Sequence, residues 1–519
     1  MTQRLTTLAA AIALLLFACN EPSGEKKPSQ STADVTLSRV KPNHLQPPTP
    51  QVPPSKDNRD QTEIKILPDQ EIASNGTTDS LLDFNTEDYD PIVENTFLSA
   101  TKEPLSTFSI DVDEAAYSNV RRFLTNGSLP PAGAVRIEEM INYFDYEYPQ
   151  PANDDPFSIN TEMAACPWNP QHRLIQIGLQ GKEIPVDDLP PSNLVFLIDV
   201  SGSMYEPNKL PLVQASLKML TDQLRPIDKV AIVVYAGNAG LVLSSTTGYQ
   251  KQKIKEAINE LEAGGSTAGG AGIELAYKIA MENFITGGNN RVILATDGDF
   301  NVGVSSDDEL VRIISDKRKT GIYLSVLGYG MGNYKDNKMQ QLADKGNGNH
   351  AYIDNISEAK KVLVNEFGST LFTIAKDVKI QVEFNPEKVQ AYRLVGYENR
   401  MLAAADFNDD HKDAGELGSG HRVTALYEVI PTGVKDSFIK SIDPLKYQLS
   451  RSQSASASDE VMTIKLRYKK PDENNSRLTM KSIPDEAAPV STSDNFRFAA
   501  AVAEFGLLLR HSDYIQQGN

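Results

Sequence analysis

The amino-acid sequence predicts a multidomain protein in which a doubly wound, Rossmann-like α/β domain is inserted between β-rich flanking segments. Strand and helix patterns alternate from residue 193 to residue 372, which is typical of a parallel sheet with helices on both faces. Apolar and polar residues alternate before residue 190 and after residue 377, as they do in half-buried strands. A length of 519 residues also exceeds what one compact core usually contains.

The predicted elements follow in order along the chain. Before the α/β domain we expect a strand at 107–112, a helix at 113–123 that Asp113 caps, a second helix at 135–144, and two strands at 157–164 and 173–179. Within it we expect strands at 194–198, 230–235, 291–295 and 322–327, and helices at 210–224, 252–261, 271–284, 307–319, 337–345 and 356–372. Strands at 378–384, 422–430 and 461–468 and a helix at 495–510 follow.

These elements and the composition divide the chain into five segments. Residues 1–19 are predicted to be a signal peptide, and residues 20–90 a Pro/Ser-rich tether with too few apolar residues to fold. Residues 91–190 form an α+β region, residues 191–375 the α/β domain, and residues 376–519 a β-rich domain. We expect the segments before 190 and after 377 to pack together, so that the α/β domain is an insertion between them.

The N-terminus has the pattern of a bacterial export signal. Arg4 precedes an apolar run, Leu8 to Ala18, which is too short to span a bilayer as a helix. The run ends in Leu-Phe-Ala-Cys19, which resembles the bacterial lipobox, where the cysteine receives the lipid. We therefore expect lipidation of Cys19 and an anchor in the cell envelope, and Asn20 favours the outer membrane. A plain secretory signal with an incidental cysteine is the alternative.

Charge and cysteine content exclude several classes of protein. A net charge of −18, from 51 Lys and Arg against 69 Asp and Glu, opposes binding to nucleic acid or to anionic lipid. The chain has two cysteines, so lipidation of Cys19 leaves Cys166 without a disulfide partner. We expect Cys166 to be a small buried residue, because the nearest histidine, His172, shows no other sign of a catalytic pair.

Two strands of the α/β domain are each followed by a polar loop, and a Gly-rich loop lies between these two loops in the sequence. Asp199-Val-Ser201-Gly-Ser203 follows the first apolar strand, Thr267 lies in the Gly-rich loop 264–270, and Asp297 follows a later strand. Loops at the carboxyl ends of parallel strands converge on one edge of the sheet. Hydroxyl and carboxylate oxygens favour Mg²⁺ or Mn²⁺ over zinc. Phosphate binding is disfavoured, because the Gly-rich loop lacks a Gly-Lys-Ser/Thr ending.

This five-residue pattern resembles the metal ion-dependent adhesion site (MIDAS) of von Willebrand factor type A domains. The resemblance implies that Ser201 and Ser203 coordinate the metal directly, and that Thr267 does so directly or through water. Asp199 and Asp297 would act mainly through bridging water. In that family a Glu or Asp of a partner protein completes the coordination, which implies protein–protein interaction as the function here.

The ordered chain as a whole resembles a bacterial family of von Willebrand factor type A lipoproteins. Residues 108–113 and 135–144 match the family's associated N-terminal region, and the β-rich segment resembles its C-terminal domain. This chain ends at Asn519 soon after its last predicted helix, whereas the relatives continue with another helix. We therefore expect the C-terminal domain to be incomplete.

Two alternatives to a metal-dependent adhesion module remain. A metal-dependent hydrolase needs a base or nucleophile beside the ion, but none of the six histidines lies in the three loops. We therefore expect no enzymatic activity. A scaffold with a vestigial metal site is the other alternative, and only metal dependence of partner binding separates it from the adhesion module.

Overall fold

The computed structural model describes residues 87–152, 154–265, 269–298, 307–366, 372–412, 414–439, 458–471, 473, 475–486 and 491–515. The predicted signal peptide, Cys19 and most of the predicted tether lie outside these residues. The end of the predicted tether is described, and it contacts the folded part of the chain. Glu87 pairs with Arg122 at 2.7 Å, and the Asp88 amide donates to the Tyr334 carbonyl at 3.1 Å. The predicted boundary of the tether at residue 90 therefore lies too late in the sequence, because residues 87 and 88 already contact the folded part. Of the helices in the described part, none combines the length and apolarity that a membrane crossing requires.

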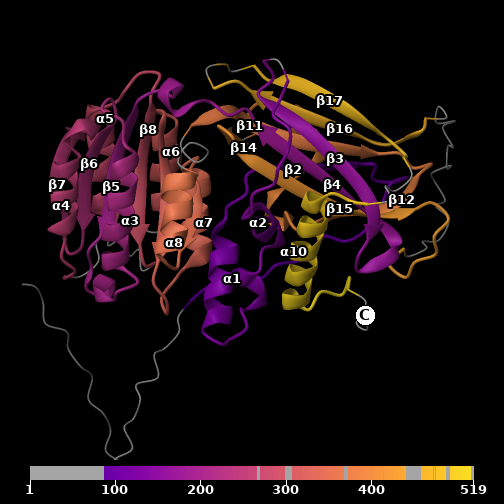
Figure 1. Cartoon of the computed structure of the whole chain (residues 1–519), viewed down its shortest axis with the longest axis horizontal. Helices are drawn as coiled ribbons and strands as arrows, with labels where there is room; N and C mark the ends of the chain where they lie inside the picture. Colours follow the sequence, from indigo (N-terminus) through magenta and orange to yellow (C-terminus); the bar gives the residue numbers. More distant parts are fainter. Residues whose placement is uncertain are drawn as a thin grey trace, which may run out of the picture. The chain divides into compact units, whose positions relative to one another are not determined.

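The centre of the α/β domain is a six-stranded sheet in the order β10-β9-β8-β5-β6-β7 (Figure 1). Its strands pair in parallel except β7, which is antiparallel to β6. The strand β5 is buried along its whole length, as its unbroken apolar sequence predicts. The bounds are β5 Ser192–Asp199, β6 Lys229–Tyr235, β7 Ala239–Thr247, β8 Asn289–Thr296, β9 Ile322–Tyr329 and β10 His350–Ile353.

Helices cover both faces of this sheet, so the doubly wound prediction is confirmed. One face packs against α3 Leu210–Gln223, α4 Lys251–Asn259, α8 Ile356–Lys360 and the π-helical turn η5 Lys361–Asn365. The other packs against α5 Gly269–Glu282, α6 Asp307–Arg318 and α7 Asp336–Lys345. The predicted helix 356–372 is too long, because Phe372 is not helical and directly precedes a strand. The edge strands β7 and β10 were not predicted from the sequence.

The flanking segments form two packed sheets with one apolar core between them. Their orders are β1-β12-β15-β4-β3 and β13-β2-β11-β16-β17, and β14 pairs with β11. The strands before the α/β domain are β1 Leu98–Ser99, β2 Leu105–Ser109, β3 Phe157–Cys166 and β4 Asn169–Gly181. Those after it are β11 Thr373–Phe384, β12 Val389–Val395, β13 Met401–Leu402, β14 Gly415–Gly418, β15 Arg422–Pro431, β16 Glu460–Lys469 and β17 Arg477–Pro484.

Each sheet combines strands from both sides of the α/β domain. Ser109 of β2 lies opposite Lys379 of β11, and Ile177 of β4 lies opposite Ala425 of β15. The α/β domain is therefore an insertion in a β-sandwich, as predicted.

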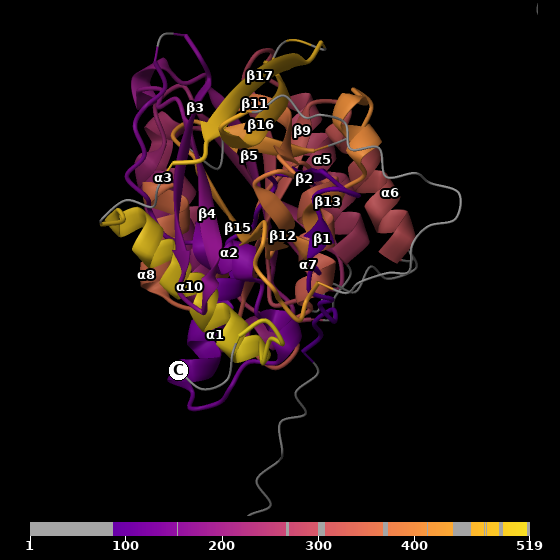
Figure 2. The ribbon, with the colours of Figure 1, turned by 90° about the vertical axis from the view of Figure 1, so that its right-hand side faces the viewer.

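Three further helices pack on the outer face of the sheet that contains β4 and β15. They are α1 Ala115–Thr125, α2 Ile137–Asn142 and α10 Asp494–Arg510. Figure 2 shows α10 beside α2, and Gly506 permits this approach, because a Cβ there would lie 2.9 Å from Ile137 Cγ1. Short helical turns complete the described elements: η1 Ala132–Ala134, η2 Val186–Asp188, η3 Gly202–Tyr205, η4 Gly248–Gln250, η6 Glu398–Arg400 and η7 Ala404–Asn408.

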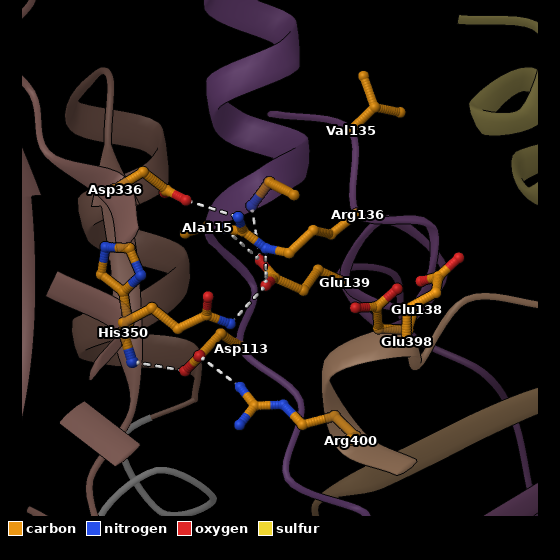
Figure 3. Close-up of polar contacts among 12 residues, drawn as sticks. Asp113, Ala115, Val135, Arg136, Glu138, Glu139, Asp336, His350, Glu398 and Arg400 are labelled. Carbon is orange, nitrogen blue, oxygen red and sulfur yellow. Dashed lines mark hydrogen bonds and ion pairs between the residues drawn. The ribbon is translucent and has the colours of Figure 1, made fainter. Parts of the chain in front are cut away.

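Asp113 does not cap α1, which corrects the sequence interpretation. The residue before α1 is Glu114, and its side chain makes no capping hydrogen bond. Asp113 is buried, accepts a hydrogen bond from the His350 amide at 2.8 Å and pairs with Arg400 at 3.1 Å (Figure 3). Its role is to join the segment before α1 to β10 and to η6, a contact that local sequence cannot reveal.

Arg136 makes a second buried contact between the inserted domain and the flanking region. Figure 3 shows its guanidinium reaching Asp336 of α7 on one side and Glu139 of α2 on the other. The distance to Asp336 Oδ2 is 2.5 Å, and all three side chains are almost fully buried. Ion pairs of this kind fix the orientation of two packed elements, because separating them leaves charges in an apolar setting.

Candidate metal centre

The carboxylate of Asp199 ends β5 and is held from three sides. It is fully buried, and its Oδ1 accepts a hydrogen bond from the Ser201 amide at 2.9 Å. Its Oδ2 accepts hydrogen bonds from Tyr235 Oη at 3.0 Å and from Thr296 Oγ1 at 3.1 Å. Tyr235 ends β6 and Thr296 ends β8, so the convergence of strand ends fixes the rotamer of this carboxylate.

The two predicted serine ligands lie side by side. Ser201 Oγ and Ser203 Oγ are 3.1 Å apart, with Ser201 buried and Ser203 exposed. Adjacent ligands of an octahedral Mg²⁺ ion, at bond lengths of about 2.1 Å, are separated by about 3.0 Å. The spacing of the two hydroxyls therefore fits two neighbouring ligands of one magnesium ion.

Asp297 follows β8 and is fully buried beside a lysine. Its Oδ2 accepts hydrogen bonds from Lys209 Nζ at 3.0 Å and from Asn333 Nδ2 at 3.1 Å. The other amide atom, Asn333 Oδ1, is buried and finds no hydrogen-bond partner within the described part of the chain. A buried acceptor left without a donor is costly, and the hydration water of a bound cation would supply one.

The two buried aspartates make this edge of the sheet favourable for a cation. Burial raises the pKa of Asp199, hydrogen bonds from Ser201 lower it, and neighbouring Asp297 raises it, with a result of about 6. A divalent ion beside both carboxylates would favour their charged forms. The donor set present, two hydroxyls and two carboxylates, therefore fits a hard cation.

Thr267 lies outside the described residues, so its position stays a prediction. The start of its loop contacts the serine segment directly: Gly202 donates to the Gly265 carbonyl at 3.1 Å, and Gly264 donates to the Val200 carbonyl at 2.7 Å. The structure thus brings together four of the five predicted residues. Among the described residues no cluster of three or more His, Cys, Asp or Glu side chains could hold a metal, so a zinc-type site is not found there.

Four residues that orient the two aspartates were not predicted from the sequence. Tyr235 and Thr296 are the last residues of β6 and β8, while Lys209 and Asn333 lie in the loops before α3 and after β9. Their common signal is position, because each lies at or after the carboxyl end of a strand. The five-residue pattern does not include them, and polar residues at strand ends are too frequent to single them out.

The environment of Cys166 opposes a role as a nucleophile. The thiol is buried, and that burial raises its pKa well above the ordinary range, which disfavours the reactive thiolate. His172 is also buried, but its Nδ1 lies 2.5 Å from Glu428 Oε1 and its Nε2 lies 3.0 Å from Asp436 Oδ2. His172 belongs to a structural ion cluster that also contains Arg393, paired with Glu428 at 2.6 Å.

This cluster predicts a pH-dependent contribution to stability. Burial lowers the pKa of His172, but hydrogen bonds and charge from Glu428 and Asp436 raise it above its ordinary 6.5. A raised folded-state pKa gives stability that is complete below about pH 6.5 and is lost as the pH rises through the folded-state value. We expect the unfolding temperature of the wild type to exceed that of His172→Gln most at pH 5.5 to 6.5, and the difference to shrink toward pH 9. A difference that grows with pH would contradict the charged state of His172.

Three family descriptions match successive parts of the chain. "Von Willebrand factor" matches residues 83–176, "von Willebrand factor type A domain" matches residues 193–366, and "Uncharacterized protein YfbK, C-terminal" matches residues 369–519. The second match covers the inserted α/β domain, and the other two cover most of the segments that form the sandwich.

Solved structures with similar folds are distant in sequence. A von Willebrand factor type A protein from Catenulispora acidiphila is 16% identical with a TM-score of 0.39, covering 63% of this chain and 72% of that one. Proximal thread matrix protein 1 from the mussel byssus, described with a zinc-occupied MIDAS motif, is 24% identical with a TM-score of 0.29, covering 37% of this chain and 46% of that one.

One curated relative is much closer. The uncharacterized protein YfbK of Escherichia coli is 45% identical over 439 residues, which is 83% of this chain and 75% of that protein. A UPF0353 protein of Mycolicibacterium gilvum is 28% identical over 197 residues, or 33% of this chain and 58% of the relative. The chain therefore belongs to the bacterial YfbK family, in which a von Willebrand factor type A domain lies between an associated N-terminal region and the YfbK C-terminal domain.

Proposed function

We propose that this protein is an envelope-anchored binding module that uses a divalent metal to bind an acidic residue of a partner protein. Ser201, Ser203 and Thr267 would hold Mg²⁺ or Mn²⁺, with Asp199 and Asp297 acting through water. When bound, the ion offers one coordination position to a Glu or Asp carboxylate. The observation that carries the proposal is the 3.1 Å spacing of the two serine hydroxyls above two buried carboxylates.

The surface beside the serines supports access by a partner. Ser203 is exposed, and Tyr205 in the same turn is 81% exposed. A tyrosine held at a surface offers a large contact area at low entropic cost, which suits a binding interface. The aspartates beneath are buried, so a partner would reach the ion from the serine side.

The anchor belongs to the same proposal. Lipidation of Cys19, after removal of the preceding signal residues, would attach the chain to a membrane, and we place it in the outer membrane. The tether from residue 20 would then hold the folded part away from the bilayer. Mass spectrometry of the membrane-extracted protein tests this part: a mature N-terminus at Cys19 with added acyl mass supports it, and an unmodified Cys19 contradicts it.

Metal-dependent capture of partners tests the function. Purified wild-type protein would be immobilised and offered envelope extract, once with Mg²⁺ and once with EDTA. The Asp199→Ala variant would be tested in Mg²⁺, and Ser244→Ala, at an exposed position of β7, is the matched control. A partner retained by wild type and Ser244→Ala in Mg²⁺, and lost in EDTA and in Asp199→Ala, supports the proposal. Identical capture in all four arms contradicts it and favours a scaffold whose metal site is vestigial.

The position of Lys209 beside Asp297 predicts an effect on the affinity for the metal. Its ammonium lies 3.0 Å from Asp297 Oδ2, where its positive charge would oppose a divalent ion. We expect Lys209→Met to strengthen Mg²⁺ binding by about fivefold, since a nearby unit charge commonly changes such free energies by about 1 kcal/mol. Isothermal titration with Mg²⁺ measures this, and Lys218→Met on α3, the helix that follows Lys209, is the control. Weaker binding in Lys209→Met would mean that the lysine instead positions Asp297 for the metal.

A further inference from the structure

Arg291 is a buried cation that the protein leaves without a carboxylate. It is 2% exposed, near the start of β8, and its Nη1 donates to Ser325 Oγ at 2.7 Å. Its Nε is buried and has no hydrogen-bond partner among the described residues, and the guanidinium carbon lies 5.6 Å from the centre of the Tyr323 ring. A neutral hydroxyl and an aromatic ring offset only part of the cost of burying this charge.

The other buried arginines show how unusual this is. Six arginines of the described part are buried, and the remaining five each have a carboxylate within ion-pairing distance. These pairs are Arg122 with Glu87, Arg136 with Asp336, Arg393 with Glu428, Arg400 with Asp344, and Arg510 with Glu398. The fold thus pairs buried guanidinium groups as a rule, so the exception at Arg291 calls for an anion from outside the chain.

Arg291 lines a polar cavity of about 380 Å³. The cavity lies where the inserted domain meets the sandwich, because its walls include α7 and the strands β2, β8 and β14. Its lining contains five basic residues: Arg291, Arg318, Lys345, Arg400 and Lys412. In a chain with a net charge of −18, this is a local concentration of positive charge.

The acidic residues of the cavity have other partners. Arg400 pairs with Asp344 at 2.9 Å and with Asp111 at 3.4 Å, which accounts for two of the three lining carboxylates. The third, Glu416, accepts a hydrogen bond from Asn347 at 3.4 Å. Burial lowers the pKa of Arg291 to about 10, and the nearby charges of Tyr323 and Glu416 raise it only in part. Within the described part of the chain, none of the three carboxylates forms an ion pair with Arg291.

We propose that this cavity binds a small oxyanion of the phosphate, sulfate or carboxylate class, with Arg291 at its floor and Lys345 at its rim. Guanidinium groups suit such ligands, because their planar N–H donors match pairs of oxygen atoms. The site is separate from the metal centre: Arg291 precedes Asp297 by six residues of strand, about 20 Å. A ligand here contacts both the inserted domain and the sandwich, so it would stabilise their contact.

Anion-dependent thermal unfolding of the full chain tests this proposal. Chloride would be replaced stepwise by phosphate, sulfate or acetate at constant ionic strength, with EDTA present so that the metal centre plays no part. We expect at least one of the three oxyanions to raise the unfolding temperature above its value in chloride, with saturation. The three arms separate tetrahedral anions from carboxylates. Equal unfolding temperatures in all four salts would overturn the proposal.

Matched variants assign the effect to the cavity. Arg291→Met should weaken the fitted affinity at least about tenfold, as loss of a charge-assisted hydrogen bond commonly does. If Arg291→Met does not fold, Lys345→Ala serves in its place, because Lys345 is exposed, and it should weaken the affinity about threefold. Lys253→Ala, at an exposed position on α4, should leave the affinity unchanged. Equal weakening in Lys345→Ala and Lys253→Ala would show a general charge effect and overturn the site.

Discussion

Ser203→Ala is expected to weaken Mg²⁺ binding by about 100-fold, as judged by isothermal titration or by electron paramagnetic resonance with Mn²⁺. Removing a residue that only supports a metal ligand commonly costs 10- to 100-fold in affinity, so removing a direct ligand should reach at least the upper end of that range. Ser203 is exposed, and within the described part of the chain its hydroxyl contacts only that of Ser201, so the fold should tolerate alanine.

A comparison with Ser244→Ala separates the loss of the Ser203 hydroxyl from the loss of any exposed serine hydroxyl. That exposed serine lies on β7, away from the carboxyl ends of the parallel strands, and its loss should leave the affinity unchanged. Circular dichroism spectra of both variants should match the wild type. Undiminished Mg²⁺ affinity in a folded Ser203→Ala would show that this hydroxyl does not coordinate the ion, and would leave the Asp199 and Asp297 pair without its proposed purpose.

The second large effect is expected at Arg136, in the free energy of unfolding. Arg136→Met removes the cation that lies between Asp336 and Glu139 and leaves two carboxylates in a buried setting (Figure 3). Breaking one partner of a buried ion pair commonly costs about 3 to 5 kcal/mol. Arg136 lowers the pKa of Asp336 against the effect of burial, so that carboxylate should also take up a proton more readily in the variant.

Guanidinium chloride unfolding measures the loss, and Arg477→Met provides the matched control. Arg477 pairs with Glu473 at 2.8 Å, but both side chains are substantially exposed, so this substitution should cost about 0 to 1 kcal/mol. Adding Asp336→Asn to Arg136→Met should recover part of the lost stability, because it removes one unpaired charge. A cost at Arg136 no larger than the cost at Arg477 would mean that water reaches this contact.

Long buried strands and amphipathic helices made part of the fold predictable from the sequence, although the buried strands β10 and β12 were missed. The strand β5 is buried on both faces, so its apolar run identified the inserted sheet, and α3 and α5 had clear helical periodicity. The edge strand β7 was missed because only two of its nine residues are buried, so it lacks a regular apolar alternation. The strand β17, at the edge of its own sheet, was missed for the same reason, since almost all its side chains are exposed. Edge strands lack the hydrophobic pattern that a buried position imposes.

The candidate metal site was predictable only as the five-residue pattern, without the residues that orient its aspartates. The Asp-x-Ser-x-Ser segment is local in sequence, whereas Lys209 and Asn333 approach Asp297 from separate loops. The same limit explains Asp113, which was predicted to cap α1 and instead pairs with Arg400, 287 residues away in sequence. Sequence patterns report neighbours along the chain, and these contacts depend on topology.

The insertion of one domain into another also sets the order in which the chain can fold during synthesis. Thr107 and Gln381 lie opposite each other in the sandwich but are 274 residues apart in sequence. At about 5 to 20 residues per second, a ribosome needs roughly 15 to 50 s to make the intervening chain. The strands of the inserted sheet come from a shorter stretch and can pair before the sandwich is complete. On a nascent chain the α/β domain should therefore fold first. Until β11 emerges and pairs with it, β2 keeps an unpaired, aggregation-prone edge.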